Sequence, residues 1–379
     1  MHAKTPRWLL AAPVALLAMF MVPALSSAAD NEVVFGLIQP LTAQGATIGQ
    51  GMVRGVELAL EHINAAGGVL GGKKLTYIVE DDQCNPPTAV SAAKKLINQN
   101  HVKIIVGAMC SSATMAIMPV TREAEVLHIV PLSYHPDITE KGQPYLFRTC
   151  ITSNTNREFV DFMVEKTGVK RVALLGVNDD FGRGELGVFA KRFEALGAKV
   201  VSTEFFRFED RDFSIYLAKI KAAKPDGIYI VARSPQHAMI VNQMKEMNFS
   251  PKIFGSGNFS DQEFVNLTKQ NGDGVYAVVD WSKDIDNPTN RKFVEAYKAK
   301  YGNYDGANYA EPGYTAVLVL ADAINRAGTA SDVPKLGAAM KKVHVPVPWG
   351  PLSFDEKGQA RVHVFPVQLK NGEFGLVKQ

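Results

Sequence analysis

The chain has 379 residues, of which 46% are hydrophobic and 21% charged, and its formal net charge at pH 7 is +3. This composition is typical of a soluble globular protein, and the length is sufficient for two lobes with separate cores. Because acidic and basic residues alternate along the chain, the small positive excess does not indicate nucleic-acid binding, and no nucleic-acid partner is expected.

The N-terminal residues differ from the rest of the chain. Basic residues precede the apolar run 8–25, and small residues follow it. This order predicts a secretory signal peptide over residues 1–29, cleaved after Ala28 or Ala29. An N-terminal membrane anchor is the alternative, because ~18 apolar residues approach the length that spans a bilayer. We expect a mature protein that is exported to the periplasm.

Strands and helices alternate after this segment. In a first group we expect strands at 32–40, 74–82, 102–107 and 127–133, and helices at 49–68, 88–100 and 115–125. In a second group we expect helices at 157–168, 181–197, 212–224, 234–248 and 261–272, and strands at 171–179, 199–206, 226–233, 252–257 and 274–281. Repeated βα units with aliphatic strands indicate parallel sheets covered by helices on both faces. The two groups predict two α/β lobes.

The C-terminal third breaks this alternation. Three helical segments, 291–302, 310–328 and 332–343, follow one another without a clear strand between them. The end of the chain then has the pattern of strands joined by turns at 356–358 and 370–372. Because the extra helices must cover a sheet formed earlier, we expect the chain to cross back to the first lobe, which creates a hinge and a cleft.

Export to an oxidising compartment makes the three cysteines informative. Cys84 follows the strand at 74–82, and Cys110 follows the strand at 102–107. If these strands are neighbours in a parallel sheet, both thiols lie at the same edge, which favours a Cys84–Cys110 disulfide. Cys150 is then expected to be an unpaired, buried thiol.

The sequence contains none of the common catalytic or cofactor motifs. The first strand is not followed by G-x-G-x-x-G or by a P-loop, and H-E-x-x-H, C-x-x-C and G-x-S-x-G are absent. Asp81 and Asp82 are adjacent on a strand, so their side chains point to opposite faces and make a poor acid–base pair. We therefore expect no enzymatic activity, no cofactor and no metal site.

Several segments together resemble one protein family. The stretches "DDQCNPPTAVSAAKKLINQ", "VKIIVGAMCSSATMAI", "GVELALEHINAAGGVLGGKKL", "FGRG" and "GPLSFDEKGQ" are similar, in order and spacing, to the leucine/isoleucine/valine-binding proteins of bacterial ABC importers. This resemblance implies a type I periplasmic binding protein: two Rossmann-like α/β lobes joined by a three-crossover hinge. It implies an N-terminal lobe of residues 30–151 and 281–360, and a C-terminal lobe of residues 152–280 and 361–379.

The resemblance also implies a ligand site at the corner "GAMCSSAT", where this family holds a ligand carboxylate. Ser111, Ser112 and Ala113 would begin a helix there, and its free backbone N–H groups and positive dipole end suit one carboxylate. The alternative is that the serines only cap the helix. Further positions carried over from the family are Ser133 and Tyr134 after the next strand, Tyr309, and Gln39 or Thr42 as polar contacts near an aliphatic Ile48.

Three positions depart from the family's amino-acid-binding pattern. Gly257 stands where the family offers a carboxylate to the ligand ammonium, while Arg233 and Phe181 stand where tyrosines are frequent. An ammonium buried without a paired carboxylate is costly, so we predict a ligand with one or two anionic ends and no free amine. Arg233 would bind its carboxylate or a polar substituent, and the aromatic lining would come from Phe181, Tyr134, Tyr309 and Trp281. Alternatively, Arg233 pairs with a neighbouring acid and Trp281 only packs near the hinge.

These expectations together describe the extracytoplasmic receptor of an ABC importer. We expect a small carboxylate, an aromatic or other organic acid, as the ligand, a membrane permease as the partner, and a monomer. A dicarboxylate or a branched-chain amino acid is an alternative ligand. A sensor that passes ligand occupancy to a regulator is an alternative role for the same fold.

Overall fold

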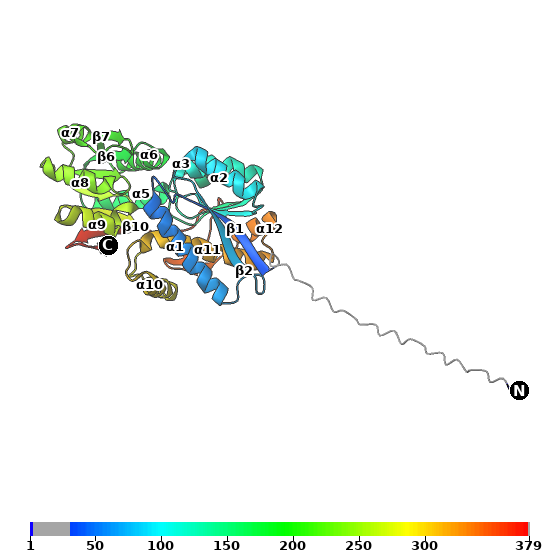
Figure 1. Ribbon diagram of the computed structural model, residues 1–379. Coiled ribbons are helices and arrows are strands. Elements are labelled where there is room, and N and C mark those ends of the chain that lie inside the picture. The colour runs from blue at the N-terminus through cyan, green and yellow to red at the C-terminus, as the bar shows by residue number, and fades with distance from the viewer. Residues whose placement is uncertain (3–30, 378–379) are drawn as a thin grey trace.

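The computed structural model describes residues 1–2 and 31–377, so all but the first two residues of the expected signal peptide lie outside the described residues. Two α/β bodies lie side by side, each built around one large sheet (Figure 1). Within the described part of the chain, no helix is both long enough and apolar enough to cross a membrane.

The first sheet has the strand order β2-β1-β3-β4-β5, and all of its pairs are parallel. Its strands are β1 (Glu32–Gln39), β2 (Lys74–Asp81), β3 (Ile104–Val106), β4 (Leu127–Val130) and β5 (Leu146–Arg148). The helices α1 (Ala46–Ala65), α2 (Pro86–Asn98), α3 (Ser111–Glu123) and α4 (Asp137–Glu140) alternate with them. Phe35 and Leu37 of β1 lie in one apolar cluster and Ile38 in another, so helices cover both faces of this sheet.

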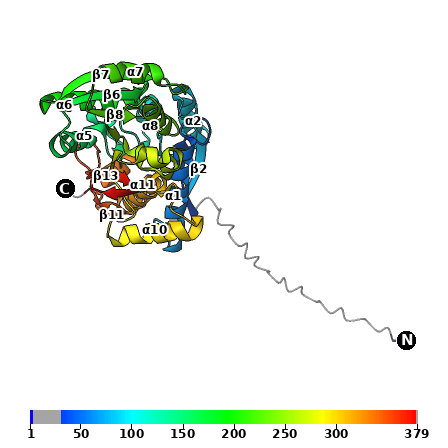
Figure 2. The same ribbon diagram turned by 90° about the vertical axis from the view of Figure 1, so that its left-hand side faces the viewer.

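The second sheet has the order β14-β13-β10-β9-β8-β6-β7, parallel from β10 to β7 and antiparallel at β13 and β14. Its strands are β6 (Arg171–Val177), β7 (Lys199–Phe206), β8 (Gly227–Val231), β9 (Lys252–Gly255), β10 (Tyr276–Val279), β13 (Phe365–Lys370) and β14 (Glu373–Leu376). The helices are α5 (Ser153–Asp161), α6 (Asp180–Ala195), α7 (Ser214–Ala222), α8 (Gln236–Glu246) and α9 (Gln262–Thr268), and α5 continues as a π-helix (Phe162–Lys166). Figure 2 shows α5 to α8 placed around β6 and β8. The predicted α/β class is confirmed.

Three later helices return to the first body. They are α10 (Pro288–Tyr301), α11 (Ala307–Ala327) and α12 (Val333–Met340), and α11 packs along α1. The two helices approach closely because α1 carries a glycine at the contact: a Cβ atom on Gly55 would lie 1.7 Å from the carbonyl oxygen of Ala310. A short hairpin of β11 (Val345–Val347) and β12 (Gly350–Leu352) follows.

The chain therefore passes between the bodies three times: after β5, after β10 and after β12. The first and third passages run together, because the Arg148 N–H donates to the Gly358 carbonyl (2.8 Å) and the Ala360 N–H donates to the Arg148 carbonyl (2.9 Å). The fully buried Arg148 guanidinium also donates to the carbonyl oxygens of Ser133 and His135, at 2.7 Å each. These bonds fix the loop after β4 to the hinge.

Cys84 and Cys110 form a disulfide, as predicted, with their Cα atoms 5.4 Å apart. The strand order on which that prediction depended was wrong, because β1 lies between β2 and β3. Both strands nevertheless end at the same edge of a parallel sheet. Cys150 is a buried free thiol, as expected, and its sulfur accepts the Ser133 N–H at 3.3 Å.

The adjacent carboxylates Asp81 and Asp82 support the turn that leads to this disulfide. Asp81 accepts the N–H groups of Leu41 and Gln83, and Asp82 accepts the N–H of Cys84 at 2.9 Å. Gln83 and Cys84 both have positive φ, 53° and 56°, so the chain turns at the sheet edge instead of continuing. Both carboxylates therefore have structural partners in the turn.

The buried Glu311 of α11 gives a testable pH dependence of stability. The Thr315 hydroxyl donates to its carboxyl group, and burial, with the nearby charge of Asp280, raises the pKa of Glu311 from 4.5 to about 8. The folded state therefore holds this proton more tightly than the unfolded chain. Its contribution to the free energy of unfolding is fully present below pH 4.5 and is lost as the pH rises through 8.

We expect Glu311→Gln to flatten the fall in the free energy of unfolding between pH 5 and pH 8, by an amount on the order of a few kcal/mol. Urea unfolding of both proteins at several pH values measures the difference. Glu295→Gln, on the exposed side of α10, is the matched control and should leave the wild-type profile unchanged. Parallel profiles for wild type and Glu311→Gln would contradict the prediction.

Candidate functional site

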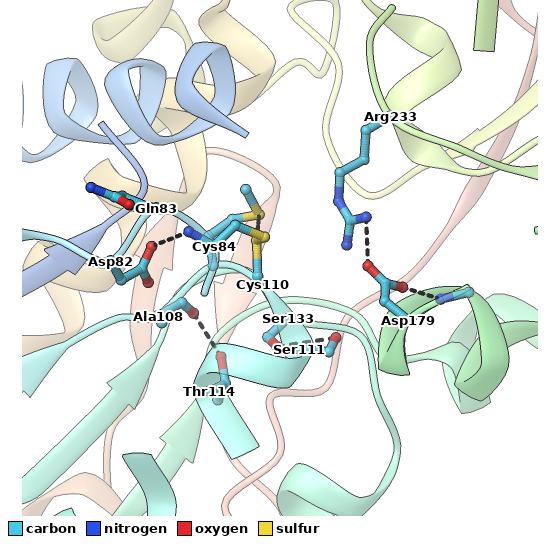
Figure 3. Close-up of a disulfide and its surroundings, with 12 residues drawn as sticks. Asp82, Gln83, Cys84, Ala108, Cys110, Ser111, Thr114, Ser133, Asp179 and Arg233 are labelled. Carbon is cyan, nitrogen blue, oxygen red and sulfur yellow. Dashed lines mark hydrogen bonds and ion pairs between the residues drawn. A yellow bond between two sulfur atoms is a disulfide. The ribbon is translucent and has the colours of Figure 1, made fainter. Parts of the chain in front are cut away.

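A small cavity lies where the two bodies face each other. It contains about 290 Å³ of atom-free space, part of which is open to solvent. Its lining comes from both bodies and consists of Ile48, Met109, Ser111, Leu132, Ser133, Tyr134, Phe181, Arg233 and Asn258. Figure 3 shows Arg233 and Asp179 on one side of this region, with Ser111 and Ser133 opposite. No aspartate or glutamate belongs to the described residues that line the cavity.

The start of α3 forms the polar end of the first wall. Its N-cap residue, Cys110, makes no side-chain cap, and the first N–H that bonds back within the helix is that of Thr114, to the Cys110 carbonyl at 2.8 Å. The N–H groups of Ser111, Ser112 and Ala113 therefore have no acceptor within the helix. Together with the helix dipole, these free N–H groups could bind a negatively charged oxygen.

The Ser111 hydroxyl strengthens this arrangement. Its oxygen lies within 3.3 Å of two donors, the Ser133 hydroxyl and the His135 N–H. Because the oxygen accepts both bonds, its own hydrogen remains available to donate elsewhere. The Ser111 hydroxyl hydrogen is therefore free to donate to an acceptor placed in the cavity.

Two aromatic rings narrow the cavity from opposite bodies. Tyr134, from the loop after β4, and Phe181, from the first turn of α6, lie edge to face with ring centroids 5.7 Å apart. Burial raises the pKa of Tyr134 well above its usual value, so its hydroxyl keeps its proton. The approach of α6 requires a glycine, because a Cβ atom on Gly184 would lie 2.6 Å from His135 Cδ2.

Arg233 provides the positive charge of the second wall. Its side chain is only 4% exposed, its guanidinium donates to Asp179 Oδ2 at 2.8 Å, and it lies over the Phe181 ring at 4.7 Å. The other oxygen of Asp179 caps α6 by accepting the Gly182 N–H at 2.9 Å. Within the described chain, this is the single side-chain hydrogen bond of Arg233, and the remaining guanidinium N–H groups are available to a bound anion.

The structure brings together five of the residues singled out in the sequence: Ser111, Ser133, Tyr134, Phe181 and Arg233 line the cavity. Ser112 and Ala113 lie beside it in the first turn of α3 and contribute backbone N–H groups. Gly257 lies at its edge, because a Cβ atom there would be 3.5 Å from the Tyr134 hydroxyl. The alternative of an ion pair for Arg233 also holds, since Asp179 is its partner.

Four other residues are not placed at the cavity. Thr42 is exposed and bonds to Asp81, and Gln39 is buried at the end of β1, where its amide has no partner among the described residues. Tyr309 bonds to Asp261. Trp281 packs on Phe293, donates to Asn290 at 2.7 Å and lines a separate groove, so the packing alternative describes it better.

Sequence reasoning missed Met109, Leu132 and Asn258. Each follows the end of a strand, one or two residues from a position that was singled out. Their place next to the ends of parallel strands was the available signal, because ligands in such folds bind outside the carboxyl ends of the strands. The partner of Arg233 was also missed, since Asp179 is 54 residues away in sequence.

A family model described as "Periplasmic binding protein" matches residues 32–373. The chain belongs to the periplasmic binding protein family. Its two lobes, with a parallel sheet in each, are those of a type I periplasmic binding protein, as the sequence resemblance implied. The site described above therefore lies in the cleft between the lobes of a binding protein.

Named relatives of this periplasmic binding protein differ in their ligands. The leucine-, isoleucine-, valine-, threonine- and alanine-binding protein of Pseudomonas aeruginosa is 31% identical over 342 residues, which is 90% of each chain. A solute-binding protein of an ABC transporter from R. palustris, solved with benzoate, is 26% identical with a TM-score of 0.84, over 91% of this chain and 95% of that one. Another, from Rhodopseudomonas palustris BisB5 and solved with 3,4-dihydroxybenzoic acid, is 28% identical with a TM-score of 0.82 and the same coverage.

Proposed function

We propose that this periplasmic binding protein is the solute receptor of an ABC importer, and that its ligand is a small aromatic acid. The observation that carries the proposal is the pairing of two anion-binding features, the Arg233 guanidinium and the start of α3, across a cavity whose described lining contains no carboxylate. The protein captures the acid by closing its lobes and then delivers it to a membrane permease.

The proposed binding mode assigns a role to each wall. The ligand carboxylate accepts hydrogen bonds from the Ser111 hydroxyl and from the first N–H groups of α3. Its ring packs against Tyr134 and Phe181, where offset or edge-to-face aromatic contacts are favourable. Arg233 binds a polar substituent or a second anionic end as a planar fork. Gly257 supplies no side chain, which leaves the Tyr134 hydroxyl accessible.

The charge balance of the site argues against an α-amino acid. An ammonium group in the closed cavity would need a carboxylate, and the acid nearest to Arg233, Asp179, is already paired with it. An unpaired buried charge costs several kcal/mol. The alternative is that the protein binds branched-chain amino acids, which are named in the description of the Pseudomonas relative. The two relatives solved with benzoates support the aromatic-acid proposal.

Further parts of the proposal follow from the family and from the sequence. Residues 1–29 act as an export signal, and the mature protein works in the periplasm as a monomer without enzymatic activity. The lobes comprise residues 30–151 with 281–360, and residues 152–280 with 361–379. A sensor of the same fold would differ only in its partner, so finding permease and ATPase genes beside its own gene would favour the importer role.

Pairs of ligands that differ only in the amine test the proposal most directly. Titration calorimetry and thermal shift compare 3-phenylpropanoate with phenylalanine, and 4-methylpentanoate with leucine, alongside benzoate and 3,4-dihydroxybenzoate. We expect the aromatic acids to bind and their amino counterparts to fail, with a stabilisation of about 2.7 kcal/mol at a hundredfold excess over Kd. Recovery of the ligand unchanged after incubation checks the absence of turnover. Binding of leucine but not of 4-methylpentanoate would contradict the proposed ligand class.

A further inference from the structure

Asn258 lines the ligand cavity, yet the binding mode proposed above gives it no role. It lies in the short 3₁₀ turn Gly257–Ser260 that follows β9 in the second lobe. The residue is only 8% exposed. A buried amide needs a partner for its N–H groups and another for its oxygen, so the bonds that Asn258 already makes decide what it can offer to a ligand.

The carbonyl group of Ala232 fixes which atom of this amide faces the cavity. Asn258 Nδ2 donates to the Ala232 carbonyl oxygen across 3.4 Å, a long hydrogen bond. Turning the amide by half a turn would place Oδ1 against that carbonyl, and two acceptors have no hydrogen between them. Among the described residues Oδ1 has no hydrogen-bond partner, and it is not one of the fully enclosed polar atoms. It therefore presents an acceptor to the free space of the cavity.

The same end of the cavity carries a donor. Arg233 directly follows Ala232, the residue to which Asn258 is bonded, and the side chains of Arg233 and Asn258 both line the cavity. Arg233 donates one side-chain hydrogen bond within its own lobe and has further N–H groups to offer. Figure 3 shows its guanidinium on the side opposite Ser111 and Ser133. A ligand whose carboxylate lies at the start of α3 therefore meets a donor and an acceptor together at its other end.

A hydroxyl group matches this donor and acceptor, whereas a second carboxylate does not. The oxygen of a hydroxyl accepts from the Arg233 guanidinium, and its hydrogen donates to Asn258 Oδ1. An ionised carboxylate has no hydrogen to donate, so it would leave Oδ1 unpaired and facing a negatively charged oxygen. An unsubstituted ring would leave both protein groups without a partner, and a buried polar group without a partner is costly.

We infer that Asn258 is a specificity-determining residue that, together with Arg233, selects aromatic acids with a ring hydroxyl over unsubstituted and dicarboxylic ones; this inference rests on the proposed function and deepens it. Of the two groups that Arg233 could bind, a polar substituent or a second anionic end, it assigns the first. Because Arg233 lies opposite the start of α3, the hydroxyl stands away from the ligand carboxylate, at position 3 or 4 of a benzoate.

The first test compares ligands on the wild-type protein by titration calorimetry. The probes are benzoate, 3-hydroxybenzoate and 4-hydroxybenzoate, with isophthalate and terephthalate, which carry a carboxylate in place of each hydroxyl. We expect at least one hydroxybenzoate to bind roughly 10- to 100-fold more tightly than benzoate, because two buried groups gain partners. It should also bind more tightly than the matching dicarboxylate. Equal Kd values for benzoate and both hydroxybenzoates overturn the inference, and so does a dicarboxylate that binds best.

The second test removes the acceptor. Asn258→Leu keeps a side chain of similar size without polar atoms, and Asn258→Ala removes the amide altogether. In both, the preference for the hydroxybenzoate over benzoate should fall to a few-fold, because the hydroxyl keeps Arg233 but has no acceptor for its hydrogen. The Kd of benzoate itself should stay close to the wild-type value in Asn258→Leu. The two Kd values are measured on the same sample, so their ratio does not depend on the folded fraction of the variant.

Asn266→Leu is the matched control. It removes an amide from α9, where Asn266 is exposed, accepts a bond from Gln262 Nε2 at 3.1 Å and does not line the cavity, so the wild-type preference should remain. An undiminished preference in both Asn258 variants overturns the inference. If none of these acids binds wild type, the proposed function fails and the inference fails with it. If benzoate binds and the hydroxyl changes nothing, the inference alone fails.

Discussion

Replacing Arg233 with alanine is expected to weaken binding of 3,4-dihydroxybenzoate roughly 100-fold, which corresponds to about 3 kcal/mol. The guanidinium is buried, lies over Phe181 and faces the start of α3. Its loss removes a charge-assisted hydrogen bond and leaves Asp179 uncompensated beside the ligand. Titration calorimetry at constant ionic strength measures the change in Kd.

Two further variants test the charge argument. Asp179→Asn keeps Arg233 and the cap on α6, so it should bind acids as tightly as wild type or more tightly. Arg233→Lys keeps the positive charge but loses the planar fork, so an intermediate loss is expected. In Arg233→Ala the difference in affinity between 3-phenylpropanoate and phenylalanine should become smaller, because Asp179 becomes free to pair with an ammonium. If Arg233→Ala binds the acid with wild-type affinity, the guanidinium does not contact the ligand and the proposed binding mode is wrong.

Removal of the disulfide has the largest expected effect on stability. Cys84 and Cys110 are 26 positions apart in sequence, and in the chain-entropy model a cross-link over such a loop stabilises the fold by about 3–4 kcal/mol. We expect Cys84→Ala/Cys110→Ala to lower Tm by roughly 5–8 °C. Ligand affinity should fall as well, because Cys110 immediately precedes the helix start to which we assign the ligand carboxylate.

The control for this variant is a change at the third cysteine. Cys150→Ser removes the free thiol and leaves the disulfide intact, so its effect on Tm should be smaller than that of the double variant. A reducing agent should lower the Tm of wild type and of Cys150→Ser but not that of Cys84→Ala/Cys110→Ala. If the double variant has the same Tm as wild type, the cross-link contributes nothing to stability.

Patterns that depend on near neighbours in sequence were predicted well. The aliphatic strands, the amphipathic helices and their order gave the α/β class, because hydrophobic periodicity is a local property. The start of α3 was located for the same reason, since a strand followed by hydroxyl residues and a helix is visible in a few positions. Ser111, Ser133, Tyr134, Phe181 and Arg233 were singled out in this way and by family resemblance.

Pairings between segments that are distant in sequence were harder to predict. The place of β1 between β2 and β3 could not be inferred, because each strand pairs well with any aliphatic neighbour. The same holds for the partner of the Tyr309 hydroxyl, which is Asp261, 48 positions away. Trp281 was placed by its proximity to the hinge, but a side-chain amide of α10 holds it in another environment.

The sequence by itself determined that two α/β halves form, that two of three cysteines meet at one sheet edge, and that a helix starts after the strand at 102–107. Only the tertiary structure decided which polar side chains face one another: Arg233 with Asp179 within one lobe, and Tyr309 with Asp261 across two. The physical reason is the separation along the chain over which each kind of interaction acts. Backbone periodicity and capping act within a few residues, whereas the partner of a buried charge is whichever group the strand order and lobe closure bring within about 3 Å.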